Sequence, residues 1–273
     1  MSTDRQAEEV DLYSALIRVL PPARMATYLT AAKNDSQLAA RLYLWNRDLS
    51  VAILGDIALL EVALRTAMHD AACTTWGPQW YQVVALDDRS CGQLATAWSH
   101  LPNAVTKQPD DPAAPGRLVA QCMFGFWTNL LDKGGYTGRE PRRLDVSYEE
   151  LWLKAFRAAF PGGRLEAKAI RHASGEVEPT FTREWVHSVC KIVNELRNRV
   201  AHHEALINGF PMKGQQGVRY TAAEGYAHLE LLARMIDRDF ASWLAVNSSV
   251  HALLGSRPES TVVNQDLPAP TPM

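Results

Sequence analysis

The chain has 273 residues, of which 47% are hydrophobic and 21% charged, so it can bury a sizeable core and is not an intrinsically disordered chain. Its formal net charge is -2 at pH 7 and its pI is ≈ 6.4. This balance excludes the overall positive field with which sequence-independent nucleic-acid-binding proteins attract phosphate. Any contact with nucleic acid must therefore be local.

The sequence shows neither a targeting segment nor a metal-binding pattern. Residues 1–9 lack the apolar core of a secretory signal, and the most apolar stretch, residues 51–64, is interrupted by Asp56 and Glu61. We therefore expect a cytoplasmic protein without membrane association, metal or other cofactor. No metal-ligand spacing relates the four cysteines, which we expect to be reduced thiols: Cys73, Cys91, Cys122 and Cys190.

Apolar residues at helical spacing predict a series of helices in the first half of the chain. A helix should begin near residue 10 and break at Pro21-Pro22, and a second should run to residue 33. Asn, Asp and Ser at residues 34–36 can cap a long helix that reaches about residue 72. Pro, Asp, Ala and Gly dominate residues 102–116 and predict an exposed loop. A helix then precedes a glycine-rich loop at residues 132–146.

Two capping boxes predict where helices begin in the second half of the chain. Residues 147–150 should begin a helix that reaches Phe160, and residues 221–224 should begin a last helix that reaches Leu244. Between them, residues 180–183 precede a helix bounded downstream by Gly209.

These elements predict an all-α fold in one domain, residues 1–255, followed by a disordered proline-rich tail at residues 256–273. We expect a helical bundle with additional N-terminal helices. Its centre should be the long early helix, the helix before Gly209 and the last helix.

A polar cluster interrupts the helix before Gly209. Apolar residues follow one face at alternating steps of three and four, and Arg197, Asn198 and His202 lie away from that face. His203 instead continues the apolar face toward Ile207, which predicts a buried, hydrogen-bonded histidine. The apolar face is formed by Val186, Val189, Val193, Leu196 and Val200.

The cluster resembles a known family. Residues 197–204 read Arg-Asn-Arg-Val-Ala-His-His-Glu, and Ile-Asn follows at residues 207–208. This segment resembles the Abi-like (abortive infection) proteins of the HEPN superfamily, whose mark is an Arg, a polar residue, a short gap and a His. Supporting segments at residues 42–46, 60–65 and 124–127 occur in the same order, so the resemblance covers roughly residues 22 to 245.

The resemblance implies a compact HEPN-like helical bundle that pairs as a homodimer, with the Arg/His motifs of the two copies facing each other. It also implies a metal-independent endoribonuclease of the abortive-infection or toxin type, active in bacterial defence against phage. A separate antitoxin or a phage-derived trigger would then control the activity.

The residue types suit RNA cleavage. The imidazole of His202 can exchange protons near neutral pH with a ribose 2′-OH or a leaving 5′-oxygen. The fork of donors on Arg197 can bind the nonbridging phosphate oxygens as charge develops. Asn198 lies one helical turn before His202 and can hold the imidazole or contact the phosphate. We expect supporting roles for Glu61, Arg65 and His203, with Glu61 and Arg65 orienting Arg197.

Simpler interpretations remain open for several of these residues. Arg197 can be an ordinary exposed arginine, and Glu61 and Arg65 an ordinary i, i+4 ion pair. The aromatic residues at 124–127 can stack on bases but are typical of a core. At the level of the whole protein, the alternative is a non-catalytic HEPN-like helical dimer that binds RNA or a protein.

Basic residues are concentrated between Arg139 and Arg171. This segment can contribute weakly to an RNA groove, with Arg142 and Arg143 as the candidates, joined by Arg199 of the motif. Interspersed carboxylates make a solvated helix face and loop the more ordinary interpretation.

Overall fold

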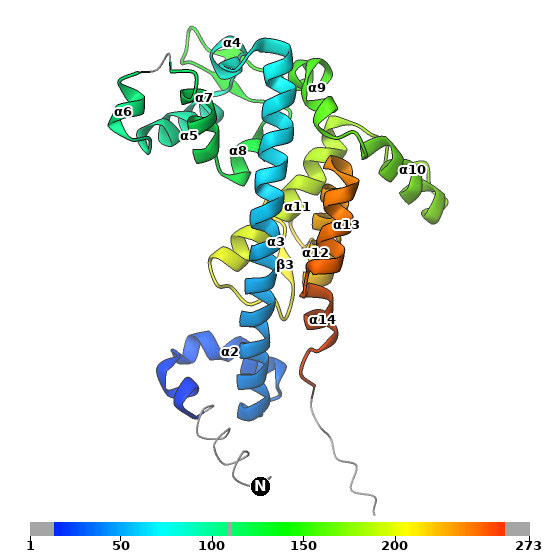
Figure 1. The fold of residues 1–273 in the computed structure, drawn as a ribbon. Coiled ribbons are helices and arrows are strands. Elements are labelled where there is room, and N and C mark those ends of the chain that lie inside the picture. Colours follow the sequence, from blue (N-terminus) through cyan, green and yellow to red (C-terminus); the bar gives the residue numbers. More distant parts are fainter. Residues whose placement is uncertain (1–13, 109–110, 260–273) are drawn as a thin grey trace, which may run out of the picture. The chain divides into compact units, whose positions relative to one another are not determined.

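The computed structural model describes residues 14–108 and 111–259 (Figure 1). They form two compact units: the described parts of Met1–Ser50 and Val250–Met273 make up the first, and Val51–Ser249 the second. The single domain expected for residues 1–255 thus contains two units. Of the tail expected to be disordered, residues 260–273 lie outside the described residues.

Helices make up most of the described chain, which confirms the all-α class. Within the described residues, the strands form two antiparallel pairs, β1 (Tyr136–Thr137) with β2 (Leu144–Asp145), and β3 (Phe210–Pro211) with β4 (Arg219–Tyr220). Residues 14–19 are also helical. In chain order the named helices are α2 (Pro22–Ala31), α3 (Ser36–Trp76), α4 (Trp80–Val83), α5 (Asp88–Ser99), α6 (Asn103–Thr106), α7 (Ala114–Gln121), α8 (Phe124–Asn129), α9 (Glu149–Lys154), the 3-10 helix η1 (Phe156–Ala159), α10 (Gly163–Ser174), α11 (Arg183–Ala201), α12 (Ala222–Ile236), α13 (Arg238–Asn247) and α14 (Val250–Gly255).

The first unit contains α2, the beginning of α3, and α14. Asp35 caps α3, because its carboxylate accepts hydrogen bonds from the backbone N–H groups of Gln37 at 2.9 Å and Leu38 at 3.1 Å. The indole of Trp45 donates to the carbonyl of Leu253 at 2.7 Å, which joins α3 to α14. The helix break expected at Pro21-Pro22 and the cap expected at residues 34–36 are both confirmed.

In the second unit, α3 continues through Gly55 and buries a stripe of apolar residues against its neighbours. Asp56, on the same helix, accepts hydrogen bonds from the hydroxyls of Tyr226 at 2.8 Å and Ser248 at 2.6 Å. These bonds satisfy a half-buried carboxylate and join α3 to α12. The buried stripe comprises Ile57, Leu60, Leu64, Met68 and Ala72.

α11 is the helix around which the second unit packs. The hydroxyl of Thr182 caps it by accepting from the backbone N–H of Trp185 at 3.3 Å, and its apolar face is buried as expected. α11 packs against α12 and α8. The start of α11 is held by Arg183, whose buried guanidinium donates to Glu149 at 2.8 Å and to the carbonyl of Leu131 at 2.9 Å.

Three expected boundaries are wrong. The loop expected at residues 102–116 contains α6 and the start of α7. The helix expected to reach Phe160 ends at Lys154, because Ala155 leaves helical geometry with φ -136°. At the start of the same helix the expected capping box is missing, since Tyr148 is the N-cap residue. The last helix is interrupted at Asp237, which is extended and caps α13 through the N–H of Phe240 at 2.7 Å. The capping box of Thr221 and Glu224 is confirmed.

Among the described helices, none combines the length and apolar character needed to cross a bilayer.

Candidate functional site

A cavity of about 690 Å³ lies between α5, the α7–α8 junction and α11, and it is called here the Arg197 cavity. α8 packs against both α5 and α11, which brings the three helices together. α11 contributes Asn194, Arg197 and Asn198, and α5 contributes the most residues of any wall. The structure therefore places two of the residues expected at the site, Arg197 and Asn198, in one hollow.

Arg197 is half-buried, and among the described residues its guanidinium has no ion pair or hydrogen bond. A fixed cation of this kind keeps its full set of donors for a ligand. Its surroundings are polar but neutral on the α11 side, where Asn194 lies 3.8 Å from the position that a Cβ atom on Gly125 would take. On α5, the side chain of Gln93 accepts from the amide of Asn129 at 2.7 Å.

Glu61 and Arg65 form the expected i, i+4 ion pair, with 3.7 Å between Arg65 Nη2 and Glu61 Oε1. Glu61 also accepts a hydrogen bond from the backbone N–H of Phe124 at 3.0 Å, which fixes the start of α8. Neither residue lines the Arg197 cavity, and neither contacts Arg197 in the described part of the chain. Glu61 is therefore joined to a wall of the cavity through α8, and within the described residues Arg65 pairs with Glu61 and not with a residue of the cavity.

α11 ends at Ala201, earlier than expected, so the prediction of a buried His203 is wrong. His203 has φ 57° and is exposed. Its N–H donates to the carbonyl of Val200 at 3.1 Å, and that of Glu204 donates to the carbonyl of Arg199 at 2.9 Å. These two bonds define a Schellman turn, which stops the helix before the apolar face can continue. The side chains of Arg199 and Glu204 form an ion pair across the same turn, so Arg199 is not a free cation for RNA.

His202 is the C-cap residue of α11, and its side chain is exposed. It follows Asn198 by one turn, and its backbone N–H donates to the carbonyl of Asn198 at 3.0 Å. His202 does not line the Arg197 cavity. The structure thus brings Arg197 and Asn198 together and leaves His202 just outside, at the end of the same helix.

The imidazole that does line the cavity belongs to His100, the C-cap residue of α5, which sequence reasoning missed. A usable signal existed, because Asp88, Gly92, Thr96 and His100 recur every four residues and form one polar, small-residue face. Asp is also a preferred N-cap residue, so Asp87 was a recognisable start for this helix. In the structure its carboxylate accepts from the backbone N–H of Ser90 at 2.8 Å.

The aromatic segment of α8 is core, as its composition indicated. Phe124, Phe126 and Trp127 are buried to within 1% exposure, and only Phe126 reaches the cavity wall. Cys122 also lies in that wall, but burial raises the pKa of its thiol to about 12. The sulfur therefore stays protonated and is not a nucleophile at neutral pH.

The basic segment between Arg139 and Arg171 is divided by the structure. Arg139 and Arg143 line a hollow beside the Arg197 cavity, whereas Arg142 does not. Lys154 pairs with Glu150, and Arg171 donates to the carbonyl of Pro179 at 2.8 Å. Beyond Arg143, Lys154 and Arg171 thus make local contacts, whereas Arg164 and Lys168 are exposed.

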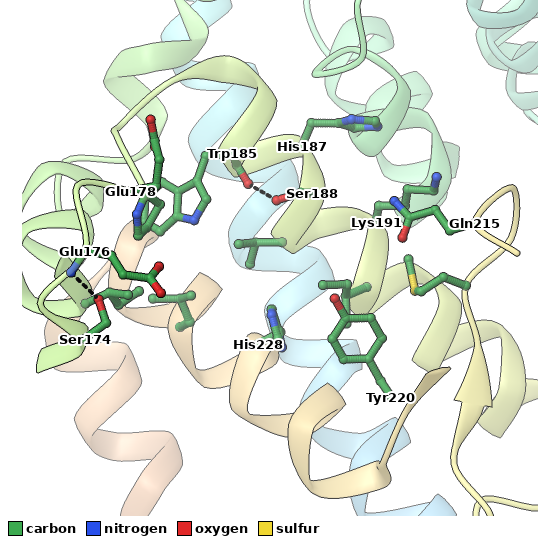
Figure 2. Close-up of a pocket in the computed structure, with 16 residues that line it drawn as sticks. Ser174, Glu176, Glu178, Trp185, His187, Ser188, Lys191, Gln215, Tyr220 and His228 are labelled. Atoms are coloured by element: carbon green, nitrogen blue, oxygen red, sulfur yellow. Dashed lines mark hydrogen bonds between the residues drawn. The ribbon is translucent and has the colours of Figure 1, made fainter. Parts of the chain in front are cut away.

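A second cavity, of about 550 Å³, lies among α10, α11, α12 and the β3–β4 pair (Figure 2). Figure 2 shows Trp185 and Ser188 of α11 facing it, together with His228 and Tyr220. His228 is engaged, because its Nδ1 atom lies 2.7 Å from the carbonyl of Glu224. The lining of this second cavity balances an ammonium, that of Lys191, against the carboxylates of Glu176 and Glu178. None of the residues expected at the site lies in this lining. Its polar residues are Ser174, Glu176, Glu178, His187, Ser188, Lys191, Gln215, Tyr220 and His228.

Within the described residues, no group of three or more His, Cys, Asp or Glu side chains is arranged to hold a metal ion. Comparison of the chain with protein-family models, with curated proteins and with solved structures found no match.

Proposed function

We propose that the protein is a metal-independent endoribonuclease of the Abi-like type and that the Arg197 cavity holds the phosphate to be cut. One observation carries the proposal: the guanidinium of Arg197, unpaired within the described residues, lines a cavity of about 690 Å³ with the amides of Asn194 and Asn198. An unpaired, half-buried cation beside neutral amides is suited to an anionic ligand such as a phosphodiester. The carboxylate of the cavity lining, Asp88, accepts hydrogen bonds from Thr137 and Gly138.

In the proposed reaction, the 2′-oxygen of a ribose attacks the adjacent phosphorus, and the bond to the 5′-oxygen breaks. A base takes the proton of the 2′-OH, and an acid gives a proton to the departing 5′-oxygen. The products are a 2′,3′-cyclic phosphate and a 5′-OH end. Arg197 stabilises the charge on the nonbridging oxygens, and His202 performs one proton transfer.

The second proton transfer needs a second group. The family resemblance implies that a second copy of the chain supplies its own His202 across a homodimer. The exposure of His202 at the end of α11 is compatible with such a contact. Within the same chain, His100 is the other candidate, because it lines the Arg197 cavity.

The first test incubates wild-type protein and five variants, one of them His100→Ala, with total RNA and transfer RNA in excess EDTA, followed by end-group analysis of the fragments. His202→Ala should abolish cleavage, and Arg197→Ala should lower its rate by about 10²–10³-fold. Arg197→Lys should restore part of the loss, because it keeps the charge without the planar fork. His172→Ala, an exposed imidazole on α10 outside the cavity, is the control.

The outcomes of this test separate the catalytic assignments. Cleavage that needs His202, and leaves cyclic phosphate ends in EDTA, supports the proposal. Equal cleavage by wild type and His202→Ala removes His202 as the catalyst, and loss in His100→Ala would then transfer the role to His100. RNA binding without cleavage by any form favours the non-catalytic binding module.

Pairing is tested by light scattering and by mixing wild type with His202→Ala. If each site needs His202 of both copies, an equimolar mixture that exchanges freely should have about half the activity of the wild-type chains alone, because about half of them then pair with an inactive copy. A monomer, or wild-type activity that is unchanged by the variant, contradicts the shared site. The role in defence is tested by plating phage on cells that express wild type or His202→Ala.

A further inference from the structure

The β1–β2 pair is bonded to the start of α5. The carboxylate of Asp88 accepts hydrogen bonds from the backbone N–H of Gly138 at 3.0 Å and from the hydroxyl of Thr137 at 3.3 Å. The preceding Asp87 lies so close to Gly135 that a Cβ atom there would come within 2.9 Å of Asp87 Oδ2. These contacts place the side chains of the β1–β2 pair and its loop beside those of α5.

A hollow of about 500 Å³ lies at this junction, and Arg89, Tyr136, Arg139 and Arg143 are part of its lining. Asp88 and Arg89 line both this hollow and the Arg197 cavity. The two hollows are therefore neighbours, and Arg89 stands between them. We name the surface from Arg197 across Arg89 to Tyr136 and Arg143 the arginine path.

The cations of the path are available, whereas of the carboxylates beside them Asp88 is engaged and Glu140 is exposed. Within the described residues, the guanidinium groups of Arg89 and Arg139 have no ion pair or hydrogen bond. The carboxylate of Asp88 already accepts the two bonds from the β1–β2 pair. A chain whose net charge is -2 thus gathers free guanidinium groups on one surface, which is the local arrangement that RNA binding would need.

The far end of the path carries a stacking platform. The guanidinium carbon of Arg143 lies 3.5 Å from the centroid of the Tyr136 ring, and Tyr136 remains 51% exposed. Aromatic rings and guanidinium planes both accept the face of any unpaired base. A base in a duplex offers no free face, because its neighbours in the stack cover it.

From these contacts we infer that the arginine path binds the unpaired nucleotides next to the phosphate in the Arg197 cavity, so that the substrate is single-stranded RNA. The inference rests on the proposed function. Phosphates of the strand follow Arg89, Arg139 and Arg143, and one base stacks on Tyr136. The β1–β2 pair thereby determines which RNA strands can reach Arg197.

The experiment measures binding separately from cleavage. Fluorescence anisotropy follows a short labelled RNA whose 2′-OH groups are all methylated, so that the proposed reaction cannot occur, over a range of salt concentrations. Tyr136→Ala should weaken binding by about fivefold or more, whereas Tyr136→Phe should bind like wild type. Arg139→Ala and Arg143→Ala should each weaken binding and lower the salt slope by about one unit.

Arg142→Ala is the matched control, because this exposed neighbour of Arg143 does not line the hollow and should leave binding unchanged. A duplex of the same sequence should bind more weakly than the single strand. The path is overturned if the Tyr136, Arg139 and Arg143 variants, with unchanged thermal unfolding, bind like wild type, or if the duplex binds as tightly as the single strand.

These outcomes are distinguishable from failure of the proposed function. Wild type that cleaves RNA while the path variants bind and cleave normally keeps the nuclease and removes the path. Wild type that binds the methylated RNA through Tyr136 and Arg143 but cleaves no RNA keeps the path and removes the nuclease. Wild type that neither binds nor cleaves removes both.

Discussion

Glu61 Oε1 accepts a hydrogen bond from the backbone N–H of Phe124 at 3.0 Å and so joins the middle of α3 to the first residue of α8. The N–H groups at the start of a helix have no partner within it, and here a half-buried carboxylate supplies one. Because Met123, Gly125 and Phe126 line the Arg197 cavity, this bond also fixes one wall of the site.

Removal of this bond should therefore lower both stability and function. We expect Glu61→Ala to lower the free energy of unfolding by about 1–2 kcal/mol, since it leaves the N–H of Phe124 without its acceptor. Glu61→Gln keeps an acceptor oxygen and should lose less. Urea unfolding followed by circular dichroism measures the difference, and equal stability of all three proteins would contradict the capping role.

Two helix-interior glycines make a matched pair. Gly55 on α3 is exposed, and a Cβ atom there meets nothing within 4 Å, so Gly55→Ala should stabilise the protein by about 0.5–1 kcal/mol. Gly225 on α12 is buried, and its Cβ atom would lie 2.8 Å from the ring of Phe210. Gly225→Ala should destabilise by about 1–3 kcal/mol. Urea unfolding of both variants checks the opposite signs.

The apolar stripes allowed α3, α11 and α12 to be predicted, because the burial of one helix face depends on local periodicity alone. Boundaries failed where a single backbone conformation ends a helix. His203 adopts a left-handed geometry, Asp237 is extended, and Ala155 leaves the helical region, although none of the three is a glycine or proline. Their conformations depend on the surrounding packing, which local propensity does not contain.

Only the part of the candidate site that lies on α11 could be predicted from the sequence. Arg197 and Asn198 share a face of α11, so their spacing placed them together. His100 and Arg89 come from α5, and a polar helix face looks the same in sequence whether it lines a cavity or faces water. The hydrogen bonds from Gly138 and Thr137 to Asp88, which bring the hairpin to α5, join segments far apart in the chain.

Alkaline pH should destabilise the fold through its buried tyrosines. Burial raises the pKa of Tyr28 to about 12, and it raises the pKa values of Tyr148 and Tyr226 as well. Above the ordinary tyrosine value of 10.0, the unfolded chain loses these protons before the folded chain does. The stability they provide is thus complete below pH 10 and declines as pH rises toward the folded values.

The measurement is the free energy of unfolding as a function of pH. Tyr226→Phe removes one of the raised groups, so its stability should decline less steeply above pH 10 than that of wild type. The same slope for both proteins would show that Tyr226 does not contribute to the alkaline loss.

The four thiols should differ in reactivity. Burial raises the pKa values of all four thiols, so exposure decides their order. Cys91 is exposed and Cys73 half-buried, whereas Cys122 is 3% and Cys190 0% exposed. Iodoacetamide should therefore modify Cys91 first in the folded protein and reach Cys122 and Cys190 only after unfolding. Mass spectrometry of peptides locates the label, and Cys91→Ser should remove the fast phase. Rapid labelling of Cys190 in the folded protein would contradict its burial.

The walls of the Arg197 cavity come from residues 88–100, 121–126 and 194–198. A chain still on the ribosome therefore has no such cavity until α11 has left the exit tunnel and docked on α8, when most of the polypeptide has already been made. If the cavity cuts RNA, the translating ribosome and its transfer RNAs are spared until α11 has emerged and docked, because a shorter nascent or truncated chain has no complete site with which to cut them.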